Sequence, residues 1–117
     1  MRILAILLII VGVFGCAEDP SVSMVKSGVL DSCPDKNMDE MVNGFLGSPK
    51  WSSGISEDGQ KFVNIEGRLT FAEKEVDGLI QFLVNDDNDR FEFSAFEINE
   101  IPQSVLIANA LLEKMCE

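Results

Sequence analysis

The sequence predicts an α+β domain of two layers, in which a helix, a three- or four-stranded antiparallel meander and a C-terminal helix follow one another. Three observations support this fold class. Apolar residues recur with helical spacing between positions 38 and 46, apolar and polar residues alternate in three segments between positions 61 and 99, and helical spacing returns after position 102. The order of these segments indicates one unit without an internal linker.

The first helix has clear start and stop signals. Residues 23–30, which precede it, are short, β-leaning and interrupted by Gly28. Asn37 and Glu40 then form a capping pair. Gly47 is expected at the C′ position, and Pro49 prevents continuation of the helix. The apolar face of this helix consists of Met38, Met41, Val42, Phe45 and Leu46.

Three strands are predicted next, over Lys61–Phe71, Val76–Asn85 and Arg90–Asn99. In the first, Gly67 takes an inward position and suggests close packing under the helix or a bulge. In the third, the apolar parity switches at Ala95 and Phe96, which predicts a bulge or a sheet that is covered on both sides. The inward residues are Val63, Ile65, Leu69 and Phe71, then Ile80, Phe82 and Val84, then Phe91, Phe93 and Ala95.

The remaining elements are a hairpin turn and the last helix. Asn85–Asp89 is a short polar connection between the second and third strands. Pro102 is expected to open a helix over 102–116. Its inward face would carry Val105, Ala108, Leu112 and Met115, widened by Leu111.

The segment before the domain predicts export. Arg2 precedes the apolar run Ile3–Phe14, which is too short to cross a bilayer and suits a secretory signal peptide. Gly15-Cys16 resembles the lipobox of bacterial lipoproteins. That resemblance implies removal of residues 1–15, lipidation of Cys16, a short tether over 16–21 and a single domain over 22–117. The alternative is an ordinary signal peptide, which would leave Cys16 as a third thiol.

The charge of the chain limits its partners. The chain carries 9 basic and 20 acidic residues, a net charge of −11. Removal of residues 1–15 takes away one basic residue and no acidic one, which makes the balance more negative still. Such a surface argues against binding to nucleic acid and against adsorption to anionic lipid. The protein would therefore be held at the membrane by its N-terminal lipid. By resemblance to lipoprotein sorting, Ala17 after the cysteine favours the periplasmic side of the outer membrane.

Two cysteines remain once Cys16 is assigned to lipid. Cys33 and Cys116 form an even pair in an exported chain, which predicts a disulfide. Closing so long a loop stabilises a fold by about 4 kcal/mol. The alternative, a reactive thiol at Cys33, lacks an activating histidine and lies between Asp31 and Asp35, which would raise its pKa.

The residue types favour a binding function over catalysis. The chain contains no histidine, the commonest general base and metal ligand, and has no Gly-rich phosphate loop. We therefore predict no catalytic residues, no cofactor and no metal. Asn85, Asp87 and Asp89 have alternate spacing that would suit calcium, but Arg90 and Phe96 stand where an EF-hand needs glycine and glutamate. A solvated hairpin tip is the favoured interpretation.

Four residues are candidates for partner binding. Trp51 is the only tryptophan and lies among Gly and Ser residues, where it would either anchor a partner or, as we favour, cap the core. Asp86, Asp87 and Asp89 form an acidic loop.

Two further resemblances can be stated. Val42 to Pro49 is similar to the V-x-x-x-L-G-x-P segment of BamE/SmpA-type lipoproteins, which assist β-barrel assembly at the outer membrane; the helix expected at 102–116 is not that family's pattern. Nearly the whole mature chain also looks like a recurrent small exported bacterial domain of unassigned activity, on Trp51, Asp58-Gly59, Val63, Gly67, Gln81-Phe82, Phe91 and Ile98-Asn99. The second resemblance implies a fold and no function.

These observations predict a lipid-anchored binding lipoprotein of the bacterial envelope with a protein partner. The alternative is an acidic inhibitor of a periplasmic or host enzyme, similar to lysozyme inhibitors, or a binder of a small ligand. The two differ in one observable. A protein-interaction module needs an exposed apolar patch, whereas an inhibitor needs a protruding acidic loop such as 85–89.

Overall fold

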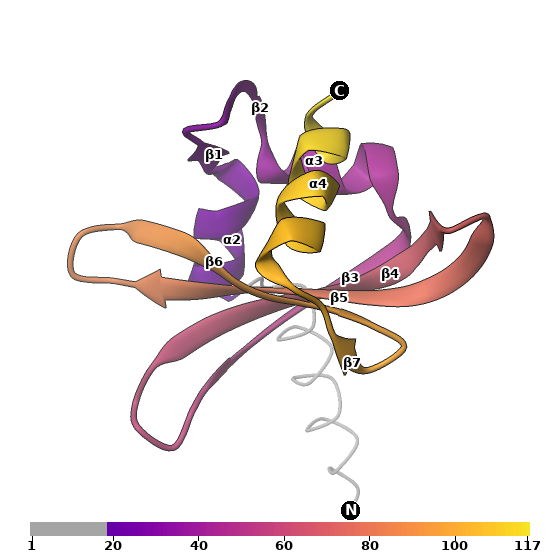
Figure 1. The fold of residues 1–117 in the computed structure, drawn as a ribbon. Coiled ribbons are helices and arrows are strands. Elements are labelled where there is room, and N and C mark those ends of the chain that lie inside the picture. Colours follow the sequence, from indigo (N-terminus) through magenta and orange to yellow (C-terminus); the bar gives the residue numbers. More distant parts are fainter. Residues whose placement is uncertain (1–18) are drawn as a thin grey trace, which may run out of the picture.

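The computed structural model describes residues 19–117, which form an α+β domain with an antiparallel meander (Figure 1). The expected signal peptide and Cys16 lie outside the described residues. The elements in chain order are α2 (Pro20–Ser27), β1 (Val29–Leu30), β2 (Cys33–Asn37), α3 (Met38–Phe45), β3 (Gly47–Ile55), β4 (Lys61–Phe71), β5 (Lys74–Asn85), β6 (Arg90–Ile98), β7 (Ile101–Pro102) and α4 (Val105–Cys116).

The main sheet has five strands in the order β3-β4-β5-β6-β7, and each strand pairs antiparallel with the next. The three helices lie on one face of this sheet, as Figure 1 shows. We call the opposite face the open face, because no element within residues 19–117 covers it. The helix-plus-meander fold class is thus confirmed, with a meander of five strands where three or four were expected, and with a separate two-stranded sheet formed by β1 and β2.

The core lies between the helices and the sheet. Helix α3 contributes the side chains that its spacing predicts, since Met38, Met41 and Val42 are fully buried. Asn37 caps this helix: its Oδ1 accepts from the Glu40 N–H at 2.8 Å, and Glu40 Oε1 accepts from the Asn37 N–H at 3.0 Å. The capping box predicted from the sequence is confirmed.

The strands at 61–71, 76–85 and 90–99 are confirmed, with β5 beginning two residues early and β6 ending one residue early. The predicted bulge in β6 is also present. Gln81 pairs with Ala95 while Phe82 pairs with Phe93, so Ser94 is the extra residue. This bulge turns Phe96 to the buried face, where it joins Ile80.

The first predicted segment was wrong. Residues 20–27 form helix α2, where the sequence suggested a β-leaning segment over 23–30 and a tether ending at 21. Asp19 is the N-cap, its side chain accepting from the Ser21 N–H at 2.8 Å, and Pro20 follows at the first helical position. Burial of Val22 and Val25, three positions apart, fixes the helix on the core.

The residues after α3 also differ from the prediction. Gly47 begins strand β3, where we expected it to terminate a helix before a turn. Leu46 is the C-cap in extended conformation. Pro49 lies in the irregular part of β3, between the paired residues Gly47 and Lys50. An edge strand tolerates proline here because only one of its sides must form a ladder.

Helix α4 starts later than predicted. Ile101–Pro102 pairs with the end of β6 as strand β7, and Ser104 caps a helix that begins at Val105. The inward face consists of Ala108, Leu111 and Met115, with Leu112 partly buried. Val105 was placed on this face by its spacing, and that placement is wrong, because the side chain is exposed.

Candidate partner-binding surface

Trp51 lies in edge strand β3, opposite Ile65 of β4, and packs partly buried against the core. The Lys26 ammonium lies 5.3 Å from the centroid of the indole ring, within the range of a cation–π contact. Trp51 therefore links α2 to the sheet edge, the arrangement expected of a core-capping residue. It lies apart from the exposed apolar residues described below.

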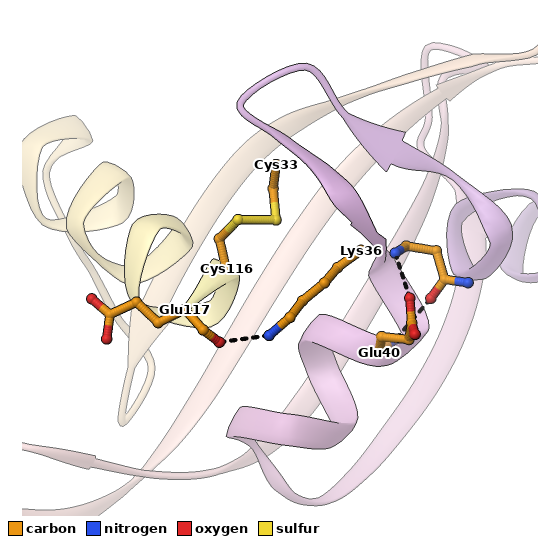
Figure 2. The surroundings of a disulfide bond; sticks show 6 residues. Cys33, Lys36, Glu40, Cys116 and Glu117 are labelled. Atoms are coloured by element: carbon orange, nitrogen blue, oxygen red, sulfur yellow. Dashed lines mark hydrogen bonds between the residues drawn. A yellow bond between two sulfur atoms is a disulfide. The ribbon is translucent and has the colours of Figure 1, made fainter.

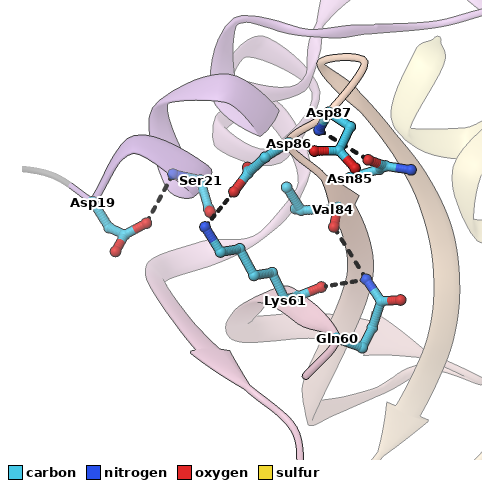
Figure 3. Close-up of polar contacts among 8 residues, drawn as sticks. All are labelled: Asp19, Ser21, Gln60, Lys61, Val84, Asn85, Asp86 and Asp87. Carbon is cyan, nitrogen blue, oxygen red and sulfur yellow. Dashed lines mark hydrogen bonds and ion pairs between the residues drawn. The ribbon is translucent and has the colours of Figure 1, made fainter. Parts of the chain in front are cut away.

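The acidic hairpin is a turn between β5 and β6. Asp86 forms an ion pair with Lys61 of β4, and the Asp87 N–H donates to Asn85 Oδ1 at 3.0 Å (Figure 3). The hydrogen bond and charge of Asp86 raise the pKa of Lys61. Asp89 has a positive φ of 52° at the end of the turn. Across residues 19–117, no group of three or more His, Cys, Asp or Glu side chains is arranged to hold a metal ion.

The neighbouring 56–60 turn closes the same end of the sheet. Asp58 accepts from the Ser56 hydroxyl and the Gln60 N–H, and these hydrogen bonds lower the pKa of its carboxyl. Gln60 Nε2 donates to the carbonyls of Lys61 and Val84, both at 3.0 Å. Asp19, where the described chain begins, is near enough for its charge to act on Lys61, and Ser21 lies beside Lys61 and Asp86 in Figure 3. We call this end of the domain, which the lipid anchor expected at Cys16 would join, the attachment end.

The predicted disulfide is present. Cys33 in β2 and Cys116 in α4 are bonded, with their Cα atoms 5.8 Å apart (Figure 2). Cys33 is buried. The Lys36 ammonium donates to the carbonyl of Glu117 next to the bond. Both sulfur atoms are bonded to each other, so Cys33 is not a free thiol in this structure and the alternative of a reactive thiol is wrong.

The open face carries a concavity at the opposite end of the sheet. It has a volume of about 770 Å³ and is bordered mainly by polar and charged side chains. Arg68 is one of its lining residues, with Nη2 3.0 Å from Glu75 Oε1 and Nε 3.5 Å from Asp77 Oδ1. The lining residues are Gly47, Ser48, Lys50, Glu66, Gly67, Arg68, Asp77, Gly78, Leu79, Glu97, Asn99 and Glu100.

The rim of this concavity contains strained backbone. Ser48, Asn99 and Glu100 have φ values of 49°, 51° and 71°, in the left-handed region. Asn99 and Glu100 are the two central residues of the turn between β6 and β7. The turn is tied to β5, because Asn99 Oδ1 accepts from the Asp77 N–H at 3.0 Å and the Asn99 N–H donates to the Asp77 carbonyl at 2.8 Å.

Three large apolar side chains next to this rim are exposed to solvent. Ile101 is 63% exposed, Val105 73% and Leu106 79%. We call these three residues the β7–α4 patch. The sequence analysis missed this patch because it assigned Val105 to the core. The available signal was that α4 carries apolar residues on all its sides, more than one inward face can bury.

The β7–α4 patch and the attachment end lie at opposite ends of the strands. Lys61, beside Asp19, pairs with Val84, whereas Ile101 pairs with Ile98, which pairs with Gly78. Val84 and Gly78 are six residues apart on β5, which corresponds to about 20 Å at ~3.3 Å per residue.

Comparison with protein families, curated proteins and solved structures gives no significant match to this chain. None of the helices within residues 19–117 is long and apolar enough to span a membrane. Inference about function therefore depends on the residues and surfaces of this chain itself.

Proposed function

We propose that this protein is a lipid-anchored lipoprotein of the bacterial cell envelope that acts as a protein–protein interaction module, on the periplasmic side of the outer membrane. The observation that carries the proposal is the β7–α4 patch. Three neighbouring large apolar side chains, each more than half exposed, stand on an otherwise strongly acidic domain. Exposed apolar clusters on a soluble domain are typical of sites where another macromolecule binds.

The anchor in this proposal is Cys16, because a short apolar run leads directly into Gly15-Cys16. Two residues, Ala17 and Glu18, separate Cys16 from Asp19, the cap of α2, and the three Cα–Cα steps between them span at most about 11 Å. Lipidation at Cys16 would hold the attachment end of the domain close to the bilayer. The β7–α4 patch would then be at the end directed toward other envelope components.

The proposal assigns no catalytic activity to the protein. The chain has neither histidine nor tyrosine. The acidic residues Asp86, Asp87 and Asp89 of the hairpin and Glu100 beside the patch are exposed, which is the environment of solvated surface charge, and Glu97 is half-buried. The segment similar to BamE/SmpA-type lipoproteins, Val42 to Pro49, covers the end of α3 and the start of β3. It is therefore separate from the β7–α4 patch.

The anchor can be tested by mass spectrometry and fractionation. Protein extracted from membranes should lack residues 1–15 and carry added acyl mass. A Cys16→Ser variant should lose the acyl mass and leave the membrane fraction, since charge alone does not hold so acidic a domain at an anionic surface. A wild-type protein recovered soluble and unacylated, or a Cys16→Ser variant still retained and acylated, contradicts the anchor.

A second candidate function is inhibition of a basic envelope or host enzyme, such as a lysozyme. The observation that favours it is the β5–β6 hairpin, which projects from the sheet in Figure 1 and carries Asp86, Asp87 and Asp89. The inhibitor hypothesis requires that the full-length lipoprotein slow a basic muramidase in a standard turnover assay. It also requires that Asp87→Asn/Asp89→Asn relieve this inhibition. No slowing by the wild-type protein rejects it.

A further inference from the structure

We propose that the β7–α4 patch binds an apolar segment of a partner protein that is flanked by lysine or arginine residues. This inference rests on the proposed function and names the surface and the chemistry of the partner. It involves the end of the domain opposite to the attachment end. The occupant is therefore a protein other than this one, and the bilayer and a second copy of the chain are the competing occupants.

The charge around the patch selects a basic partner. Between Arg90 and Lys114 the chain carries four glutamates, at positions 92, 97, 100 and 113, and no basic residue. The concavity next to Ile101 is lined by four acidic residues, Glu66, Asp77, Glu97 and Glu100, against two basic ones, Lys50 and Arg68. Glu100 directly precedes Ile101 and Glu97 pairs with Pro102, so both glutamates border the β7 end of the patch, where the neighbours of a docked apolar group would lie. Basic neighbours gain attraction there, whereas acidic ones are repelled.

The same charges disfavour the two competing occupants. An anionic bilayer is repelled by a surface on which acidic residues outnumber basic ones, and the patch lies about 20 Å along β5 from the attachment end. A second copy would place equal acidic rims against each other. The net charge of −11 opposes that contact throughout the molecule.

The patch is also held in place before any partner binds. The Gln103 N–H donates to the Phe96 carbonyl at 2.8 Å, and Gln103 Nε2 donates to the Ile101 carbonyl at 2.9 Å. Ser104 caps α4 by accepting from the Ile107 N–H at 3.3 Å. These hydrogen bonds fix β7 and the first turn of α4 relative to β6, so binding does not have to order this segment.

Site-specific photo-cross-linking in living cells tests the inference on the full-length lipoprotein. A photoreactive residue replaces Leu106, and matched probes replace Ile55, an equally apolar residue that is 64% exposed at the attachment end, Ser52 on the open face and Asp87 in the hairpin. The inference expects a protein adduct from position 106 whose linked peptide is apolar with flanking lysine or arginine. An adduct at 106 to lipid, to this protein itself or to a peptide without basic residues overturns it.

Charge reversal gives the second arm. Glu97→Lys/Glu100→Lys should lower the yield of the Leu106 adduct by about tenfold or more, because it replaces attraction with repulsion. The matched variant Asp31→Lys/Glu57→Lys changes the net charge equally at two exposed positions outside the patch and the hairpin, and should leave the yield unchanged. Equal effects of both variants overturn the inference. Thermal unfolding of each purified variant verifies that the fold is intact.

The outcomes separate this inference from the proposed function. Protein adducts from position 52 or 87 without one from position 106 overturn the patch assignment and leave the interaction module standing. Absence of protein adducts from all four positions contradicts the interaction module itself.

Discussion

Gly67 is the residue at which the sequence and the structure agree most closely. Its inward position in an alternating strand predicted close packing, and an added Cβ would lie 2.9 Å from Leu46 Cβ and 3.1 Å from the Gly47 carbonyl oxygen. The end of α3 therefore rests directly on the backbone of β4. Gly44, two residues before Leu46 in α3, has no heavy atom within 4 Å of an added Cβ.

Because an added Cβ meets neighbours at Gly67 and none at Gly44, replacement by alanine should have opposite effects on stability at the two positions. Gly67→Ala should lower the free energy of unfolding by roughly 1–3 kcal/mol, since Leu46 and backbone must move apart. Gly44→Ala should raise it by about 1 kcal/mol, because alanine is the better helix former and meets no obstacle. Urea denaturation of both variants measures these shifts. An unchanged or raised stability for Gly67→Ala contradicts the packing described for α3 and β4.

Val105 shows where inference from single residues fails. Its spacing matched the buried face, but Ser104 caps the helix one position earlier and the inward direction passes through Ala108, Leu111 and Met115. Periodicity gives a face only when apolar residues are confined to one side of a helix, and α4 has them all round. The candidate partner surface could not be located from the sequence for this reason.

At the scale of elements, local signals predicted those segments that carry their own boundaries. Helix α3 has a capping box, and β4, β5 and β6 alternate clearly. Strand β3 has Gly47, Ser48 and Pro49 at its start and Ser52 to Gly54 near its end, a composition typical of a turn. It is a strand because β4 supplies a partner from Lys61 to Arg68. The strand conformation of β3 thus depends on pairing with β4, which the composition of residues 47–55 does not reveal.

The β4–β5 turn offers a prediction at this scale. Ala72 and Glu73 have φ values of 53° and 66°, and Phe71 pairs with Lys74 across them. A two-residue turn of this geometry prefers Asn-Gly. Ala72→Asn/Glu73→Gly should therefore raise the free energy of unfolding by about 1 kcal/mol, since it removes left-handed strain.

Thermal unfolding measures this effect as a rise of roughly 4–8 °C in Tm for a domain of this size. Glu92→Gly inside β6 is the matched control and should lower Tm. Glycine there increases the conformational entropy of the unfolded chain and adds no contact in the folded strand. A Tm for the turn variant at or below that of the wild type would show that the 72–73 backbone is unstrained.

At the scale of the whole molecule, the covalent bond between Cys33 and Cys116 joins the β1–β2 hairpin to the last helix. The two cysteines are 83 positions apart. Without this bond, α4 is held by its apolar contacts and by the hydrogen bond from Lys36 to Glu117. Counting cysteines predicted the pair correctly, because only these two remain once Cys16 is set aside as the expected lipid site.

Removal of this bond should have a large effect on stability. Cys33→Ala/Cys116→Ala should lower the free energy of unfolding by about 4 kcal/mol, the value expected for a closed loop of this length. Urea denaturation of oxidised wild type, wild type with reductant and the double variant measures the difference. The reduced wild type should match the variant, and coincident midpoints for all three would contradict a stabilising role.

The disulfide can form only after the strands of the sheet have been synthesised. The meander from β3 to β7 pairs only neighbouring strands, so each hairpin can form as soon as its own residues emerge. Cys33 emerges before all of them and Cys116 after all of them. Cys33 must therefore wait for the complete sheet before it meets its proper partner. During that interval the exposed Cys33 thiol can form a disulfide with another molecule. A closed Cys33–Cys116 bond therefore identifies a chain whose synthesis has passed Cys116.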